Sequence, residues 1–419
     1  MGTGTRRFVV VILVLVLLVG AGLLALRRWV GGAGFMQSVQ RQASAALGVE
    51  TSLGKITVDL WPAPAIALLD VKIQTTPALT AERLELRPAF RDLLSGRFEV
   101  TTLLLHGANL PQTGIDALIA ANRKRQASAA GAPVFVQRVV LDSVRWQSRG
   151  GDSYSVNADA SLDRVDRLPD KLLLTLLDGP LKGARLTLQR QQRQEWDLLL
   201  KLGGGTVRGP VSFAPAAGTG TGTEIAVKGH LETRAVELDT LARGKLSGQL
   251  EATTTFSTKA VAAGDLVGAL QTSSSFTVRN AVLRGMDLSR AVKTVGLSRG
   301  GQTSLDSLAG QVQSRGEQLA LNNLVASSGV LSANGNITIS ASRALAGRLS
   351  VSLGPTPIGA VVGIPLVLGG TLDAPEVTLT RAAMLGAAVG TMVMPGVGTG
   401  AGANLGERIG DRVKGLFGK

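Results

Sequence analysis

The sequence predicts a mainly β protein with one N-terminal transmembrane helix and short helices near both ends. Three observations lead to this class. Hydrophobic residues make up 45% of the 419 positions while aromatic residues make up only 3%, so aliphatic side chains must form the buried surface. Apolar and polar residues alternate with a period of two in many segments. One long apolar run stands near the N-terminus, at residues 8–26.

The net charge of +14 predicts an anionic partner surface, either nucleic acid or a membrane with acidic head groups. The distribution of the charge disfavours nucleic acid. Lys and Arg are scattered singly, the densest run (Arg123, Lys124 and Arg125) is short, and few aromatic residues are present to stack on bases. We therefore expect a membrane partner and no nucleic acid.

Cysteine is absent, which excludes disulfides and thiolate metal ligands. The only imidazoles, His106 and His230, are more than a hundred residues apart in the chain. Each fits a surface or strand-end position better than a metal site, because a site needs companions that the sequence does not show. We expect neither a metal nor a cofactor.

The apolar run from Phe8 through Val16 to Leu26 contains no charge and is bracketed by Arg6-Arg7 and Arg27-Arg28. Its length is that of a helix that spans a membrane. The alternative, a cleaved signal peptide, would have a shorter apolar stretch that leads to small residues rather than to two arginines. The sequence therefore predicts a single-pass membrane anchor, although the balanced arginine pairs say little about its orientation.

After the anchor, Phe35, Val39, Ala43 and Leu47 recur at helical spacing, and Gly48 is a suitable residue to end the helix. From there the pattern predicts strands separated by Gly, Asn, Asp and Pro turns. The expected strands are 55–60, 65–68, 82–86, 98–104, 185–188, 225–227, 276–278, 337–340, 349–353 and 377–380.

Pro88 and Gly96 bracket a segment that predicts one or two turns of helix. Two low-complexity stretches, 127–133 and 214–223, have the composition of flexible junctions. We divide the chain into an anchor (1–33), an N-terminal module (34–126), a middle β region (127–264), a C-terminal β region (265–380) and a Gly/Ala-rich tail (381–419).

No motif indicates an enzyme. The glycine-rich match at 398–403 lacks the following helix and acidic residue of a dinucleotide site, because the chain ends soon after it. Asp152, Asp159, Asp163 and Asp166 lie close in sequence, but their spacing does not fit a calcium loop and Arg164 neutralises part of their charge. Solvated strand ends explain these carboxylates better than acid/base catalysis.

Two stretches of the sequence resemble a known family in more than their strand pattern. Residues 278–288 with 300–310, and the segment Ile364 to Val377 with its Gly369-Gly370-Thr371 turn, resemble the C-terminal region of the AsmA family of envelope proteins. Residues 35–97, with a Trp-Pro-Ala-Pro break at 61–64, resemble that family's opening, chorein-like module. Ala281 stands where the family commonly has Gly, and Leu305 where it often has Phe. In the middle of the chain, only the pattern of strands resembles that of the family.

The resemblance implies a relative of bridge-type lipid-transfer proteins: an inner-membrane anchor, and a periplasmic body whose long curved antiparallel sheet forms a half-open apolar groove for phospholipid on its way to the outer membrane. Alternation predicts that the apolar groove face includes Ile337, Ile339, Leu349, Val351, Leu366 and Leu368. A packed core predicts the same alternation. A different class, a scaffold for envelope or outer-membrane protein assembly without lipid cargo, also stays open.

The tail is apolar and small-residue-rich over 384–405 and ends in a basic stretch. In that stretch Ile409, Val413, Leu416 and Phe417 lie at helical spacing among basic residues. We expect them to dock on the outer membrane or on an envelope protein. The alternative is a glycine-rich hairpin packed on its own sheet.

Overall fold

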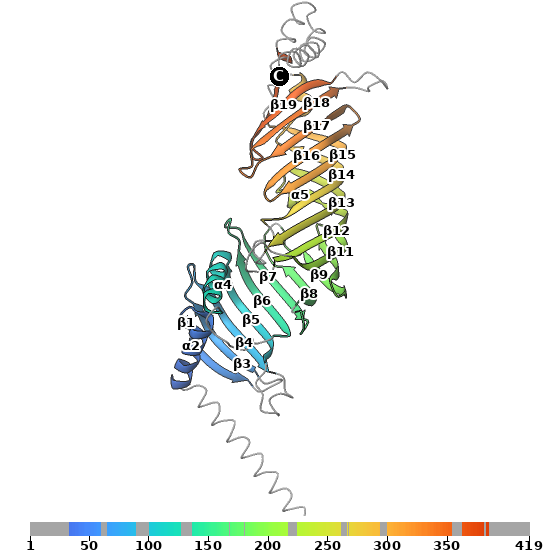
Figure 1. Cartoon of the computed structure of the whole chain (residues 1–419). Helices are drawn as coiled ribbons and strands as arrows, with labels where there is room; N and C mark the ends of the chain where they lie inside the picture. The colour runs from blue at the N-terminus through green and yellow to red at the C-terminus, as the bar shows by residue number, and fades with distance from the viewer. Residues whose placement is uncertain are drawn as a thin grey trace, which may run out of the picture. The chain divides into compact units, whose positions relative to one another are not determined.

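The computed structural model describes residues 33–59, 65–88, 100–126, 136–216 except 167 and 180, 224–260, 266, 268–293, 300–353, 363–380 and 383–384. The described chain is mainly β, as the sequence predicts, with a few short helices (Figure 1). It divides into two compact units, and the boundary along the chain falls between Gln189 and Arg190. Neither low-complexity stretch lies at this boundary.

The first unit combines a sheet with two helices of 15 residues each. Its elements are α2 (Ala33–Leu47), β1 (Thr51–Ser52), β2 (Lys55–Asp59), β3 (Ala65–Ile73), β4 (Leu79–Pro88), β5 (Val100–Pro111), α4 (Gln112–Gln126), β6 (Arg138–Gln147), β7 (Ser153–Leu162), β8 (Pro169–Leu176) and β9 (Arg185–Gln192), whose last three residues belong to the second unit.

Helix α2 is the amphipathic helix that the sequence predicts, and it ends at Gly48, which adopts a φ of 73°. Its residues Phe35, Met36 and Val39 pack against a buried cluster from β2 to β6. The buried members of that cluster are Leu53, Ile56, Leu68, Val71, Ala81, Ala108 and Val144. One face of the sheet is therefore covered here by a helix and is a closed core.

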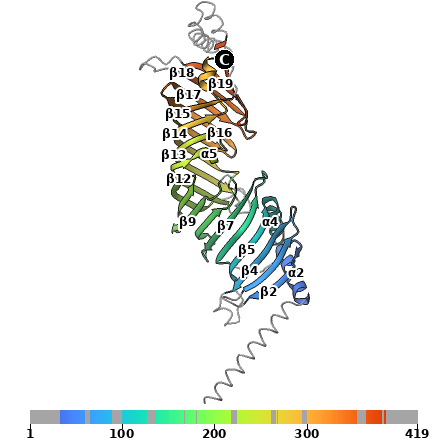
Figure 2. The same ribbon diagram turned by 180° about the vertical axis from the view of Figure 1, so that it is seen from behind.

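The expectation of a wholly antiparallel sheet is wrong at one place, because β5 and β6 pair in parallel. Helix α4, which the sequence analysis missed, connects these two strands and returns the chain to the end where β5 began. It lies beside α2 (Figures 1 and 2). The indole N–H of Trp146 on β6 donates to Gln112 Oε1 at 2.9 Å, which joins α4 to the sheet.

The second unit is built from antiparallel strands, each paired with its neighbour in sequence. Its elements are β10 (Glu195–Leu202), β11 (Gly205–Ala216), β12 (Glu224–Glu237), α5 (Leu238–Leu241), β13 (Leu246–Ala260), β14 (Gln271–Arg284), α6 (Leu288–Lys293), β15 (Gln302–Arg315), β16 (Gln318–Ser328), β17 (Leu331–Ile339), β18 (Leu345–Leu353), β19 (Ile364–Gly370) and β20 (Pro375–Leu379).

Each predicted strand overlaps an observed one; the predictions 337–340 and 377–380 run one residue past β17 and β20, and β12 and β14 are much longer than the predicted 225–227 and 276–278. The prediction of a junction at 214–223 is wrong in its first part. Residues 214–216 continue β11 beyond Phe213 and pair with β12. The strand therefore extends past the start of the low-complexity stretch. Residues 217–223 lie outside the described chain.

The two faces of this second sheet differ in character. On β16, Leu324 and Ala326 are buried, whereas Val325 between them is 55% exposed. The same alternation repeats along β14 and β15. We call the face that carries Leu324 and Ala326 the inner face and the opposite one the outer face. The period-two pattern in the sequence is therefore expressed as two distinct surfaces.

Every second strand across part of this sheet contains an extra residue. β12, β14 and β16 each place two residues opposite one on a neighbouring strand. At these bulges Ala235, Asn280 and Asn323 adopt φ values of 50–52°, in the left-handed region. A bulge bends its strand and increases its twist. The bulges thus curve the sheet toward its inner face.

Two bulges are fastened by the same side-chain bond. The backbone N–H of Asn323 donates to Asn336 Oδ1 on β17 at 2.8 Å, and that of Ser143 in the first unit donates to Asn157 Oδ1 on β7 at 2.7 Å. Each bulge residue has a backbone donor that the ladder cannot satisfy. The neighbouring asparagine supplies the missing acceptor.

Several predictions concern residues outside the described chain. They are the membrane anchor at 8–26, the Trp-Pro-Ala-Pro break, the helical turn at 89–96, the junction at 127–133 and the tail after Met384. Within the described residues, no helix is both long and apolar enough to cross a membrane. These predictions stay predictions.

The bulge bond gives a first testable prediction. Replacing Asn336 with Ala leaves the Asn323 N–H without its acceptor and is expected to lower the free energy of unfolding by about 1 kcal/mol. Asn334, exposed two residues away on the same strand, is the matched control, and its replacement with Ala should change stability by less than about 0.5 kcal/mol. Urea unfolding followed by circular dichroism measures both. Equal losses for the two variants would show that the bond does not fasten the bulge.

Candidate functional site

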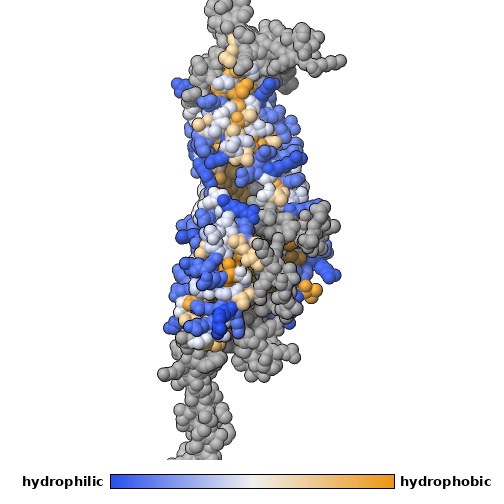
Figure 3. Space-filling view, turned by 60° about the vertical axis from the view of Figure 1, so that its left-hand side comes forward, coloured by the Kyte–Doolittle hydropathy of each residue, from blue (hydrophilic) through white to orange (hydrophobic). Residues whose placement is uncertain are grey.

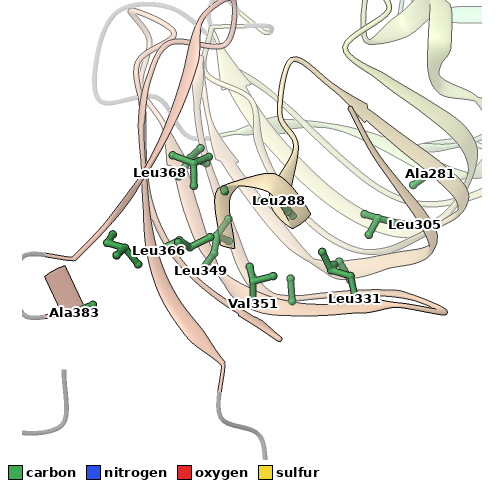
Figure 4. Packing of buried hydrophobic residues seen from close by; sticks show 14 of the residues in the cluster. Ala281, Leu288, Leu305, Leu331, Leu349, Val351, Leu366, Leu368 and Ala383 are labelled. Carbon is green, nitrogen blue, oxygen red and sulfur yellow. The ribbon is translucent and has the colours of Figure 1, made fainter. Parts of the chain in front are cut away.

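The inner face of the second unit is closed at its C-terminal end. There α6 contacts β15 and β18, and Leu288 and Ala291 of this helix are buried in a cluster with Leu305, Val351 and Leu366. Figure 4 shows Leu288 close to Leu349 and Val351. Val351 and Leu366 have no exposed surface at all. This part of the inner face is packed core.

The position of α6 is fixed by polar contacts at its first turn. Asp287 Oδ1 accepts from the Arg290 N–H at 2.8 Å, as a helix-capping side chain does. The hydroxyl of Thr303 on β15 accepts from the Leu288 N–H at 3.0 Å and donates to the Met286 carbonyl at 2.8 Å. Thr303 is buried, so these bonds satisfy polar groups that water cannot reach.

Next to this core the inner face is hollow. A cavity of about 610 Å³, which we call the apolar cavity, is lined mainly by aliphatic side chains. Those at its centre are Leu308, Leu319, Leu321, Ile337, Ile339 and Leu345. They are only partly buried, unlike Val351. A space-filling view of the C-terminal half shows hydrophobic residues in a strip flanked by hydrophilic ones (Figure 3). The volume is in the range that holds a small-molecule ligand.

A second, more polar cavity of about 810 Å³ adjoins the apolar cavity and shares Leu319, Ile339 and Leu345 with it. At this cavity and next to it, hydroxyl side chains of neighbouring strands bond to each other across the inner face. Thr254 and Ser274 are 2.8 Å apart, and Thr272 and Ser314 are 2.7 Å apart. The inner face therefore changes from aliphatic to hydroxyl-lined along the strands.

The curvature brings the start of β13 close to the turn between β19 and β20, beside the apolar cavity. Lys245 Nζ, just before β13, lies 3.4 Å from the Asp373 carbonyl oxygen in the turn between β19 and β20, although 128 residues separate them in sequence. Arg343 Nη1 lies 3.5 Å from Asp373 Oδ2 in the same turn. Beside Lys245, Arg284 Nη1 donates to the Gly244 carbonyl at 2.8 Å. These contacts close part of the hollow.

The sequence-derived groove residues divide into two groups. Ile337 and Ile339 line the apolar cavity and are only partly buried, whereas Val351 and Leu366 lie in the packed core; Leu349 and Leu368 are buried members of that core that also border the cavity. Alternation placed all six on one face but could not tell which part of that face α6 covers. The candidate anchor residues Phe8, Val16 and Leu26, and the docking candidates Ile409, Val413, Leu416 and Phe417, lie outside the described chain.

Other residues considered in the sequence form ordinary ion pairs and turns. Asp159 pairs with Arg138 at 2.7 Å, and the hydrogen bond from this guanidinium lowers the pKa of Asp159 despite partial burial. Asp163 accepts from the backbone N–H groups of Val165 and Asp166 in a turn. His106 Nδ1 lies 2.9 Å from Asp142 Oδ2. Among the described residues no cluster of His, Asp or Glu has the arrangement of a metal site.

The fold and cavity together define a β-sheet protein with a polar outer face and a partly open, apolar inner face. In comparisons with known proteins, no family model, no curated protein and no solved structure matches this chain.

The division of the inner face into core and cavity gives a second prediction. Val351→Asp places a charge in a fully buried position without a partner, at a cost of several kcal/mol, and is expected to prevent accumulation of folded protein. Ile337→Asp, at a partly exposed cavity position, should cost less than about 2 kcal/mol and leave the protein folded. Limited proteolysis and circular dichroism compare the variants. Equal loss of both variants would mean that the cavity is core.

Proposed function

We propose that this protein is anchored in the inner membrane, holds phospholipid acyl chains against the inner face of its sheet, and supports lipid transport to the outer membrane. The observation that carries the proposal is the apolar cavity. Aliphatic side chains that could be buried by closer packing are instead left partly open around about 610 Å³ of space. An exposed apolar hollow of this kind is typical of a ligand-binding groove.

The chemistry of the cavity favours acyl chains over other apolar ligands. Its central lining is Leu and Ile, with no aromatic ring among the described lining residues to stack on a planar ligand. The outer face alternates to polar residues, so the strands separate water from the cavity. The low aromatic content of the whole chain agrees with this.

The membrane and transport parts of the proposal rest on the sequence. The apolar run at 8–26 has the length of a membrane span, and the net charge of +14 favours an anionic membrane surface. The resemblance to AsmA-type envelope proteins supplies the expected direction, from the inner to the outer membrane, and the periplasmic location of the body.

A charge placed in the cavity tests the proposal directly. The double variant Leu319→Asp with Ile337→Asp is expected to reduce co-purified phospholipid roughly tenfold, because two carboxylates in the aliphatic part of the lining would face acyl chains, which cannot solvate a charge. Lipid is extracted from the detergent-solubilised full-length protein and quantified per mole of protein by mass spectrometry. Val325→Asp, on the outer face of the same sheet, is the control and should retain the normal lipid content.

The outcomes separate the two function classes. Lipid in molar proportion in the native protein and the Val325 variant, but not in the double variant, supports the groove. Absence of lipid from the native protein, together with normal envelope function of the double variant in cells that lack redundant relatives, would instead identify a scaffold without lipid cargo.

A further inference from the structure

Four basic residues line the apolar cavity where the start of β13 approaches the turn between β19 and β20. They are Arg243 and Lys245, between α5 and β13, Arg284 at the end of β14, and Arg343 in the turn between β17 and β18. We call them the cation cluster. The four come from three separate segments of the chain. Pairing of β13 with β14 places Arg284 beside Gly244, and the contacts of Lys245 and Arg343 with Asp373 bring Arg343 to the same cavity.

The contacts tie these residues into one group. Arg284 bonds to the carbonyl of Gly244, which lies between Arg243 and Lys245 in the chain. Lys245 reaches the main chain of Asp373, and Arg343 reaches the carboxylate of the same residue. The cluster is therefore a continuous basic edge rather than four independent surface charges.

The cluster has more positive than negative charge. Asp239 pairs with Arg284 at 2.5 Å, and Asp373 pairs with Arg343 at 3.5 Å. Arg243 and Lys245 form no ion pair with any carboxylate of the described chain. Four cations and two carboxylates leave an excess of two positive charges beside an apolar cavity. Like charges held together favour an anionic ligand that neutralises them.

We propose that the cation cluster is a head-group site that selects anionic phospholipids, with the phosphate at Arg243 and Lys245 and an acyl chain in the apolar cavity. The inference rests on the proposed function and adds the specificity of that site. An amphiphile matches both features at once, because one molecule carries a charged end for the cluster and an apolar end for the aliphatic lining. Arg243 and Lys245 supply specificity, and the aliphatic lining supplies affinity.

Competition between lipids tests the selectivity. Full-length protein in detergent is exchanged with vesicles of equimolar phosphatidylglycerol and phosphatidylethanolamine, re-isolated, and its bound lipids are quantified by mass spectrometry. The native protein is expected to enrich the anionic lipid at least threefold over the vesicle ratio. The enrichment should fall with rising salt, because the charges of the cluster are exposed.

Charge reversal locates the selectivity. Arg243→Glu with Lys245→Glu should abolish the enrichment while the total bound lipid stays within twofold of the native amount, because the aliphatic lining is intact. Lys259→Glu is the matched control, since Lys259 is exposed on the same strand β13 but does not line the cavity, and it should keep the enrichment. The neutral pair Arg243→Gln with Lys245→Gln should show an intermediate loss and serves if the reversed variant does not fold.

Each result decides a different claim. Lipid binding without enrichment, or enrichment that survives the reversed and neutral variants, overturns the head-group site but leaves the groove standing. Absence of any lipid from the native protein overturns the proposed function itself. If millimolar inorganic phosphate removes the enrichment without removing lipid, the cluster binds phosphate; if phosphate has no effect, the lipid-bound head group is the ligand. The first of these phosphate results counts against the proposal.

Discussion

The architecture of the second unit depends on the bulges in β12, β14 and β16. Without the extra residue in each of these strands, an antiparallel sheet of this size would twist but would not bend so strongly toward one face. Bending is what lets Lys245 meet Asp373 across 128 residues of chain. The cavity, the closed end and the gathering of basic side chains all follow from that curvature. The bulges need left-handed residues, and two of the three are asparagines, which tolerate that conformation best after glycine.

The inner face shows how one apolar surface can serve two purposes. Where α6 lies on β15 and β18, Val351 and Leu366 are buried completely and contribute to stability. Where no described element covers the face, Leu319 and Ile337 keep part of their surface open. The difference is not in residue type, since both regions are aliphatic. It lies in a helix of six residues held in place by Asp287 and Thr303.

The sequence was sufficient for the fold class and for the division into two faces, because alternation is a local property that each strand carries by itself. It also located α2, whose apolar residues recur at helical spacing. It missed α4 and the parallel pairing of β5 with β6, since Gln112 to Gln126 has no clear apolar stripe. It could not separate Val351 from Ile337, because burial there depends on a helix about fifty residues away. The basic residues at the cavity were invisible for a similar reason. They are four of 44 lysines and arginines spread along the chain, and no sequence pattern marks them as a group. Strand pairing and bending bring them together.

Pairing of each strand in the second unit with its sequence neighbours has a consequence for how such a protein can change in length. A sheet of this kind is nearly one-dimensional, since almost every ladder joins adjacent segments of the chain. Insertion or loss of one complete hairpin does not change which side chains of the other strands face inward and which face outward. The inner and outer faces therefore stay continuous. Duplication of hairpins would therefore extend the apolar surface by a fixed step while leaving both ends intact. Gain or loss of hairpins during evolution is thus a simple way to change the length of such a sheet and so the distance that it can span.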